Sequence, residues 1–122
     1  IVRALQNPYV TVLGHPEGRI LLERAAYAVE MEEVLRAAAA AGVAVEINAS
    51  PYRLDLDWRW CRQAREMGVV FWINPDAHSP GELAQIPFGL NVARKGWLGP
   101  EQVCNTWSLA ELKDRWAKRR GA

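Results

Sequence analysis

The sequence predicts an α/β fold in which parallel strands alternate with helices. Three apolar, β-branched stretches at residues 9–14, 43–48 and 68–74 end at or near a glycine or a proline, as buried strands do. A helical pattern follows each stretch. This order requires crossovers between parallel strands, which place binding groups at the carboxyl ends of the strands in an open sheet or a closed barrel.

Two helices between these strands have recognisable boundaries. The pattern predicts a helix over residues 30–41, with acidic residues in its first turn and Gly42 as the residue that ends it. Asp57 is expected to cap a second helix that runs to about Met67. Helical spacing places four side chains of the first helix on one buried face: Met31, Val34, Leu35 and Ala38.

Two serines begin segments with the spacing of a capping box. Ser79 stands three residues before Glu82 and predicts the start of a third helix, which Pro87 should interrupt. Ser108 stands three residues before Glu111 and predicts the start of the last helix.

Composition indicates a single globular domain and names no partner. Half of the 122 residues are hydrophobic and 24% are charged. The net charge of +1 argues against broad binding to nucleic acid, although it leaves room for a local basic patch. No apolar run reaches the roughly 20 residues of a membrane span, so a cytoplasmic protein without a membrane partner is expected. Cys61 and Cys104 are expected to be free thiols, and Ile1 at the first position suggests a piece of a longer protein.

Polar side chains follow the predicted strands where each strand ends. His15 follows the first strand, Asn48 ends the second, and Asp76 and His78 follow the third. Because parallel strands deliver their carboxyl ends to one rim, the two histidines and the aspartate are expected to meet there, provided that the extended path continues through residues 76 and 78. Nitrogen and oxygen ligands of this kind suit zinc, manganese or iron.

Simpler interpretations remain open for the same residues. His15, before a proline, could be a loop histidine bonded to backbone, and Asp76 could be a turn residue. Glu46 is predicted to face inward and is expected to pair inside the fold rather than to bind a metal, because an unpaired inward carboxylate is costly.

Three stretches together resemble a known family. They are VLGHPEGRIL at 12–21, VAVEINASPYRLDL at 43–56 and INPDAHSPGEL at 73–83, and the tail at 93–112 adds to the likeness. They are similar to the C-terminal motifs of the PHP (polymerase and histidinol phosphatase) domain, most closely that of bacterial family X DNA polymerases. The resemblance covers essentially the whole chain. It implies that residues 1–122 are a single partial PHP domain, the C-terminal portion of a distorted (β/α)7 TIM-like barrel whose upstream strands are missing.

The resemblance also implies an activity and a cofactor. PHP domains hold three metal ions, and His15, Asp76 and His78 would match ligands from the Gly-His-Pro and Asp-x-His motifs. The implied chemistry is phosphoester hydrolysis with manganese, zinc or iron. In the polymerase-linked members this is 3′-5′ exonuclease activity on DNA 3′ ends. The alternatives are a stand-alone phosphatase, such as histidinol phosphatase, that acts on a small phosphoester, and a non-catalytic scaffold.

Three further residues have implied or alternative roles at this site. Arg19 and Arg53 could contact substrate phosphate; the alternative is an ion pair with nearby acids, Glu17 or Glu23 for the first and Asp55 or Asp57 for the second. Asn48 is expected to orient a ligand or the loop at the strand end.

Two departures from the family pattern limit what the chain can do alone. Pro75 stands where these proteins usually carry threonine or a similar small residue, and the His-x-His motif and the middle ligands belong to strands that are absent here. Three ligands cannot enclose three metal ions. The chain alone is therefore expected to bind metal weakly and to be a poor catalyst, with an upstream polymerase and the N-terminal half of the barrel as its partners.

Aromatic and basic residues leave two further alternatives. Trp58, Trp60, Trp107 and Trp116 could stack bases, but their helical spacing favours packing against a sheet. The basic residues of 113–120 could touch a nucleic-acid backbone, but they equally suit the carboxyl end of a terminal helix.

Overall fold

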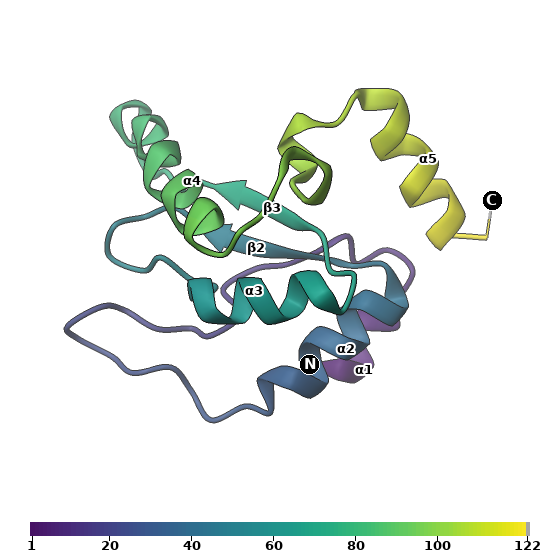
Figure 1. Ribbon diagram of the computed structural model, residues 1–122, viewed down its shortest axis with the longest axis horizontal. Helices are drawn as coiled ribbons and strands as arrows, with labels where there is room; N and C mark the ends of the chain where they lie inside the picture. The colour runs from purple at the N-terminus through teal and green to yellow at the C-terminus, as the bar shows by residue number, and fades with distance from the viewer. Residues whose placement is uncertain (122) are drawn as a thin grey trace.

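A computed structural model describes residues 1–121 and contains one small parallel sheet with helices around it (Figure 1). The strands pair in the order β1-β2-β3, both pairs parallel. The elements in chain order are α1 (Val2–Leu5), β1 (Val12–Leu13), α2 (Met31–Ala41), β2 (Ala44–Asn48), α3 (Trp58–Glu66), β3 (Phe71–Asn74), η1 (Pro80–Gln85), α4 (Ile86–Lys95), η2 (Pro100–Gln102), η3 (Cys104–Thr106) and α5 (Leu109–Arg119).

The parallel arrangement agrees with the prediction, but the strands are shorter than predicted. The first predicted strand, over residues 9–14, is reduced to two residues. Residues 1–121 form a three-stranded sheet, so the (β/α)7 barrel stays a prediction.

The helices α2, α3 and α4 cover the aliphatic face of the sheet. Val45, Ile47, Phe71 and Ile73 point to this face and are buried. Figure 1 shows α2 and α3 on one side of β2 and β3, and α4 packs against both strands and α3. Burying a side chain such as Phe71 contributes about 1.5–3 kcal/mol, so this layer is the core that fixes the strand register.

Both helices with predicted boundaries form as expected. The four side chains predicted to share one face of α2 are all buried, and Gly42 ends the helix in the left-handed conformation with φ 67°. Asp57 caps α3 by accepting a hydrogen bond from the backbone N–H of Arg59 at 2.9 Å.

One of the two predicted capping boxes is wrong. The side chain of Ser79 makes no capping hydrogen bond, and Pro80–Gln85 is a 3-10 helix. The carboxylate of Glu82 instead accepts from the backbone N–H of His78 at 2.6 Å. The helical segment is divided next to Pro87, as predicted: the 3-10 helix ends at Gln85, and α4 begins at Ile86 with Pro87 in its first turn. The capping box of Ser108 and Glu111 is confirmed.

The C-terminal segment closes one edge and part of the second face of the sheet. The side-chain amide of Asn105 accepts from the N–H of Ile73 at 2.8 Å and donates to its carbonyl at 2.9 Å, as a neighbouring strand would. The ring of Trp116 in α5 stacks on Trp72, with centroids 6.3 Å apart. Both cysteines are free, as predicted, and both are buried. Within residues 1–121 no helix is long and apolar enough to cross a membrane.

Candidate functional site

His15 lies directly beyond β1 and is held through its backbone. Its N–H donates to Glu46 Oε2 at 2.8 Å, and its φ of 46° is left-handed. The imidazole is 45% exposed, and its Nδ1 lies 3.4 Å from the side-chain nitrogen of Asn48. The backbone anchor therefore sets the position of the ring without occupying both of its nitrogens.

Asn48 is the central residue of the rim and is fully buried. Its Nδ2 lies near His15 and donates to Asp76 Oδ2 at 3.1 Å, while its Oδ1 accepts from the N–H of Ser50 at 3.0 Å. A buried amide with each polar atom engaged has one orientation. Asn48 thus fixes the ends of all three strands relative to one another.

Asp76 is also paired with an arginine. Its Oδ2 lies 3.4 Å from Arg53 Nε, and Arg53 donates through Nη1 to the carbonyl of Arg19 at 3.3 Å. The predicted alternative, an ion pair of Arg53 with Asp55 or Asp57, is therefore wrong. The structure brings Arg53 to the rim, where its guanidinium can contact an anion next to Asp76.

His78 does not follow the path on which its prediction depended. The extended conformation stops at Asp76, whose φ is 55°, so the strand geometry does not continue to residue 78. The imidazole of His78 is 79% exposed, and its Nδ1 lies 2.7 Å from the carbonyl oxygen of Asp76 and 3.8 Å from Glu82 Oε2. The ring borders a cavity of about 290 Å³ that Arg53 and Asp76 also line.

Glu46 pairs inside the fold, as expected. Besides accepting from the N–H of His15, its carboxylate accepts from the side-chain amide of Asn74 at 3.0 Å. This inward carboxylate joins β1 to β3 across β2.

The clearest residue that the sequence interpretation missed is Asp55. Its carboxylate is buried and accepts from the backbone N–H groups of Glu17, at 3.0 and 3.2 Å, and Gly18, at 3.0 Å. Burial, together with the charge of Glu17, raises the pKa of Asp55 to about 7, although the two N–H donors oppose the rise. Asp55 thereby fastens the loop that follows His15. Its spacing in the sequence carried no signal of these contacts.

A reciprocal contact secures the same loop from the other side. The carboxylate of Glu17 accepts from the N–H of Asp57 at 2.7 Å, and Arg19 pairs with Asp57 at 3.2 Å. Burial opposes ionisation of Asp57, but hydrogen bonds from Arg59 and Arg19 lower its pKa to about 2.

Arg19 is engaged in this structural network rather than at the rim. Its guanidinium donates to the carbonyls of Arg53 and Leu54, besides its pairs with Asp57 and, at 4.0 Å, Glu17. The ion-pair alternative with Glu17 therefore describes Arg19 better than the predicted contact with substrate phosphate.

The donors present only partly fit a metal ion. In residues 1–121 no group of three or more histidine, cysteine, aspartate or glutamate side chains is placed to hold one. His15 and Asp76, of suitable ligand types, are joined through Asn48, but His78 is not part of that set. The predicted ligands therefore do not form a closed metal site by themselves.

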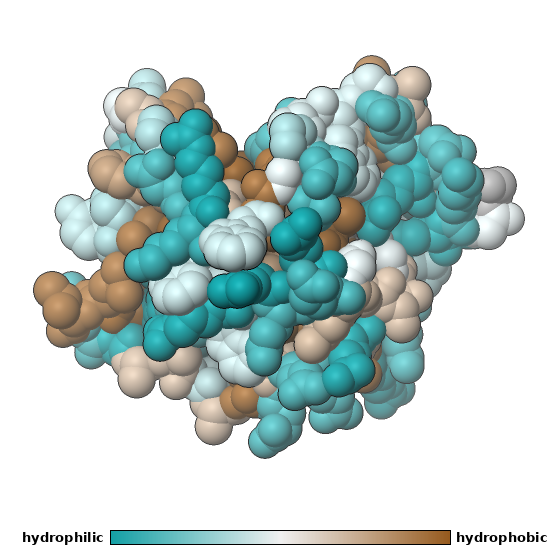
Figure 2. Space-filling view, in the orientation of Figure 1, coloured by the Kyte–Doolittle hydropathy of each residue, from teal (hydrophilic) through white to brown (hydrophobic). Residues whose placement is uncertain are grey.

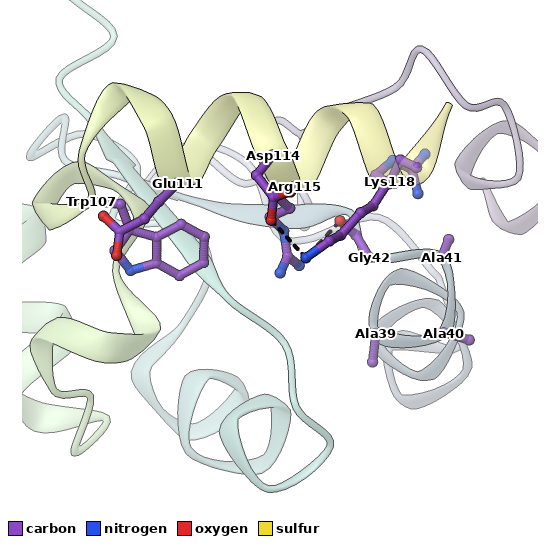
Figure 3. Close-up of a pocket in the computed structure, with 10 residues that line it drawn as sticks. Ala39, Ala40, Ala41, Gly42, Trp107, Glu111, Asp114, Arg115 and Lys118 are labelled. Atoms are coloured by element: carbon purple, nitrogen blue, oxygen red, sulfur yellow. Dashed lines mark hydrogen bonds and ion pairs between the residues drawn. The ribbon is translucent and has the colours of Figure 1, made fainter. Parts of the chain in front are cut away.

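A cavity of about 640 Å³ lies away from this rim (Figure 3). It separates α5 from the end of α2, next to Gly42, which precedes β2 and so marks the amino end of the sheet. Arg115 donates to the carbonyl of Gly42 at 3.2 Å, and Lys118 pairs with Asp114 at 2.6 Å. These contacts favour the structural interpretation of the basic C-terminal residues.

Comparison with known proteins gives relatives of two kinds. No protein-family model matches the chain. It is 37% identical over 110 residues to the DNA polymerase/3′-5′ exonuclease PolX of Bacillus subtilis (strain 168), a match that covers 90% of this chain and 19% of that protein. It is 30% identical over 120 residues to a probable phosphatase of Thermoanaerobacter sp. (strain X514), covering 93% of this chain and 46% of that protein.

A third relative extends the pattern. A probable phosphatase of Caldanaerobacter subterraneus subsp. tengcongensis is 29% identical over 126 residues, covering 98% of this chain and 47% of that protein. The chain thus spans between about a fifth and about half of the length of these curated relatives. Over nearly its whole length it is homologous to part of a polymerase-exonuclease and to part of probable phosphatases.

Proposed function

We propose that this chain is the C-terminal part of a PHP-type phosphoesterase that hydrolyses phosphodiester bonds at DNA 3′ ends. The observation that carries the proposal is the rim itself: His15 and Asp76 lie just beyond the ends of β1 and β3, on either side of β2, and are linked through the buried amide of Asn48, with Arg53 beside Asp76. A nitrogen donor, a carboxylate and a guanidinium in one place suit a phosphoester substrate. The similarity to a relative named as a 3′-5′ exonuclease supports the choice of DNA.

The proposal includes divalent metal ions, manganese or zinc, or iron. A bound metal would supply Lewis-acid chemistry and a nucleophile at neutral pH. Within this chain His15 and Asp76 would provide ligands, and His78 would join them only if its loop left the Asp76 carbonyl. The remaining donors would come from the part of the relatives' length that this chain does not cover.

The other residues of the rim would bind the substrate phosphate or hold the candidate ligands in position. Arg53 would hold a non-bridging phosphate oxygen beside Asp76, at the cavity that both residues line. Asn48 and Glu46 would keep the rim rigid, because their hydrogen bonds connect all three strand ends.

A phosphatase acting on a small phosphoester is the second candidate. It is favoured by the relatives named as probable phosphatases, of which the chain covers more than twice the share that it covers of the polymerase. A non-catalytic scaffold is the third, favoured by the lack of a three-donor group within residues 1–121.

The test uses the complete polypeptide that contains this chain, in the presence of manganese. It measures hydrolysis of two substrates, a 3′-labelled DNA strand and histidinol phosphate. His15→Ala and Asp76→Ala are each expected to reduce cleavage of the DNA at least about a hundredfold, since even outer-shell changes cost 10–100-fold at metal sites. Asp114→Ala is the matched control, because Asp114 is an exposed carboxylate on α5 whose ion pair, within residues 1–121, is with Lys118.

Three outcomes separate the candidates. DNA cleavage that depends on His15 and Asp76 supports the exonuclease. Cleavage of histidinol phosphate alone with the same dependence supports the phosphatase. No metal-dependent cleavage of either substrate supports the scaffold and overturns the proposal.

A further inference from the structure

Cationic side chains lie over two tryptophan rings, the exposed Trp97 and the half-buried Trp58, where α3 meets the end of α4. Arg62 lies over the ring of Trp97, 4.3 Å from its centroid. Lys95 lies 4.8 Å from the centroid of the Trp58 ring, and Arg59 lies 5.9 Å from it. We call these five residues the α3–α4 patch.

Close packing between the two helices produces this arrangement. A Cβ on Gly96 would lie 2.7 Å from Cys61 Cβ, so only glycine lets the end of α4 approach α3 this closely. The chain then turns at Trp97, whose φ is 61°. Lys95 and Trp97, on either side of Gly96, therefore lie beside side chains of α3.

The charges of the patch are largely uncompensated. Arg59 pairs with Asp57, but neither Arg62 nor Lys95 takes part in an ion pair within residues 1–121. Both side chains are exposed, and Trp97 is 63% exposed. In Figure 2, teal hydrophilic atoms border pale side chains over α3, and brown apolar atoms are sparse there.

We propose that the α3–α4 patch binds a single strand of nucleic acid. Unpaired cations attract phosphates, and exposed aromatic rings stack bases without regard to sequence. Three basic residues of α5 are instead engaged within the fold, since Arg115 and Arg119 donate to backbone carbonyls and Lys118 pairs with Asp114. The patch also accounts for how a chain with a net charge of only +1 can contact nucleic acid.

The patch shares no residue with the rim, which consists of His15, Asn48, Arg53 and Asp76. The choice of DNA as the strand rests on the proposed function, whereas the rings and charges of the patch do not. Binding can therefore be measured without hydrolysis, and the two proposals can fail independently.

The experiment measures the affinity of the complete polypeptide for a fluorescent oligothymidylate by anisotropy, with EDTA present and at several salt concentrations. Trp97→Ala is expected to weaken binding about fivefold or more, whereas Trp97→Tyr retains most of the affinity. Arg62→Ala and Lys95→Ala are each expected to reduce the slope of log affinity against log salt by about 0.7.

The control is Arg36→Ala, because Arg36 is an exposed arginine on α2 that pairs with Glu32. Its affinity and salt slope should match those of the unmodified protein. The proposal is overturned if Arg36→Ala loses as much affinity as the patch variants, or if Trp97→Ala and Arg62→Ala keep the affinity of the unmodified protein. It is also overturned if polyglutamate displaces the labelled strand as well as unlabelled oligothymidylate does. His15→Ala should leave binding intact, so loss of hydrolysis without loss of binding separates the rim from the patch.

Discussion

The side-chain amide of Asn48 donates a 3.1 Å hydrogen bond to the carboxylate of Asp76, linking the end of β2 to the loop after β3. The same nitrogen lies 3.4 Å from the imidazole of His15. One buried amide therefore controls the relative positions of two candidate ligands that are distant in the sequence.

Replacing Asn48 should damage the site more than the fold. Asn48→Asp keeps the size of the side chain but sets a carboxylate against Asp76, which should displace that carboxylate or raise the pKa of one of the pair. We expect a 10–100-fold loss of hydrolysis in the complete protein, as for other changes behind metal ligands. Asn91→Asp, at an exposed position of α4, is the control and should leave the activity unchanged. Equal activity of both variants would contradict the role given to Asn48.

Asp55 should make stability depend on pH. Its pKa is raised from 3.8 to about 7 in the folded protein, so between about pH 4 and pH 7 the unfolded chain has lost a proton that the folded chain retains. The contribution of Asp55 to the free energy of unfolding is therefore fully present below about pH 4 and is lost as the pH rises to about 7. Asp55→Asn should flatten this dependence.

Urea unfolding at pH 4.5 and pH 7 measures the difference. Asp57 does not interfere, because its pKa is lowered to about 2 and its contribution is lost only as the pH falls below about 4. If the unmodified protein and Asp55→Asn show the same change in free energy of unfolding between the two pH values, Asp55 does not retain its proton as described.

A methyl group at position 89 should destabilise the core. A Cβ on Gly89 would lie 2.6 Å from Ile73 Cγ2 and 2.7 Å from Ala49 Cβ, where α4 touches the sheet. Overpacking of this kind costs about 1–3 kcal/mol, which outweighs the helix propensity that alanine adds. Gly81→Ala is the control, since its Cβ would meet nothing within 4 Å. In chemical denaturation, Gly89→Ala should lower the midpoint, whereas Gly81→Ala should raise it or lower it clearly less.

Loss of the Asn105 side chain should open the outer edge of β3. Asn105→Ala removes two hydrogen bonds to the backbone of Ile73, with an expected cost of about 1–2 kcal/mol. Unpaired strand groups also promote edge-to-edge association, so the variant should self-associate more readily. Light scattering of the complete protein checks this, with Asn91→Ala as the control; equal mass distributions would show that the amide does not protect the edge.

The sequence was sufficient to predict the sheet and the shared rim for physical reasons. Alternation along β2 separates Val45 and Ile47 from Glu46 and Asn48, and parallel pairing then delivers the strand ends to one side. These rules are local and periodic, so they can be applied to one chain without coordinates.

The placement of His78 could not be predicted in this way. It depends on the left-handed conformation of Asp76, which aspartate adopts occasionally and which no repeating pattern marks. The same turn lets the backbone N–H of His78 donate to the carboxylate of Glu82. Because this carboxylate is engaged with His78, the predicted capping box of Ser79 and Glu82 does not form. Asp55 was missed for a different reason, because its partners Glu17 and Gly18 lie in a distant loop.

The guanidinium of Arg119 donates to the carbonyls of Asn7 and Val10, at 2.9 Å each, so the last helix holds the segment that leads into β1. During synthesis on the ribosome, residues 7–10 emerge long before their hydrogen-bonding partner exists. The hydrogen bonds from Arg119 to this segment can therefore form only after α5 has left the exit tunnel, whereas the pairing of β1 with β2 needs only residues that emerge earlier.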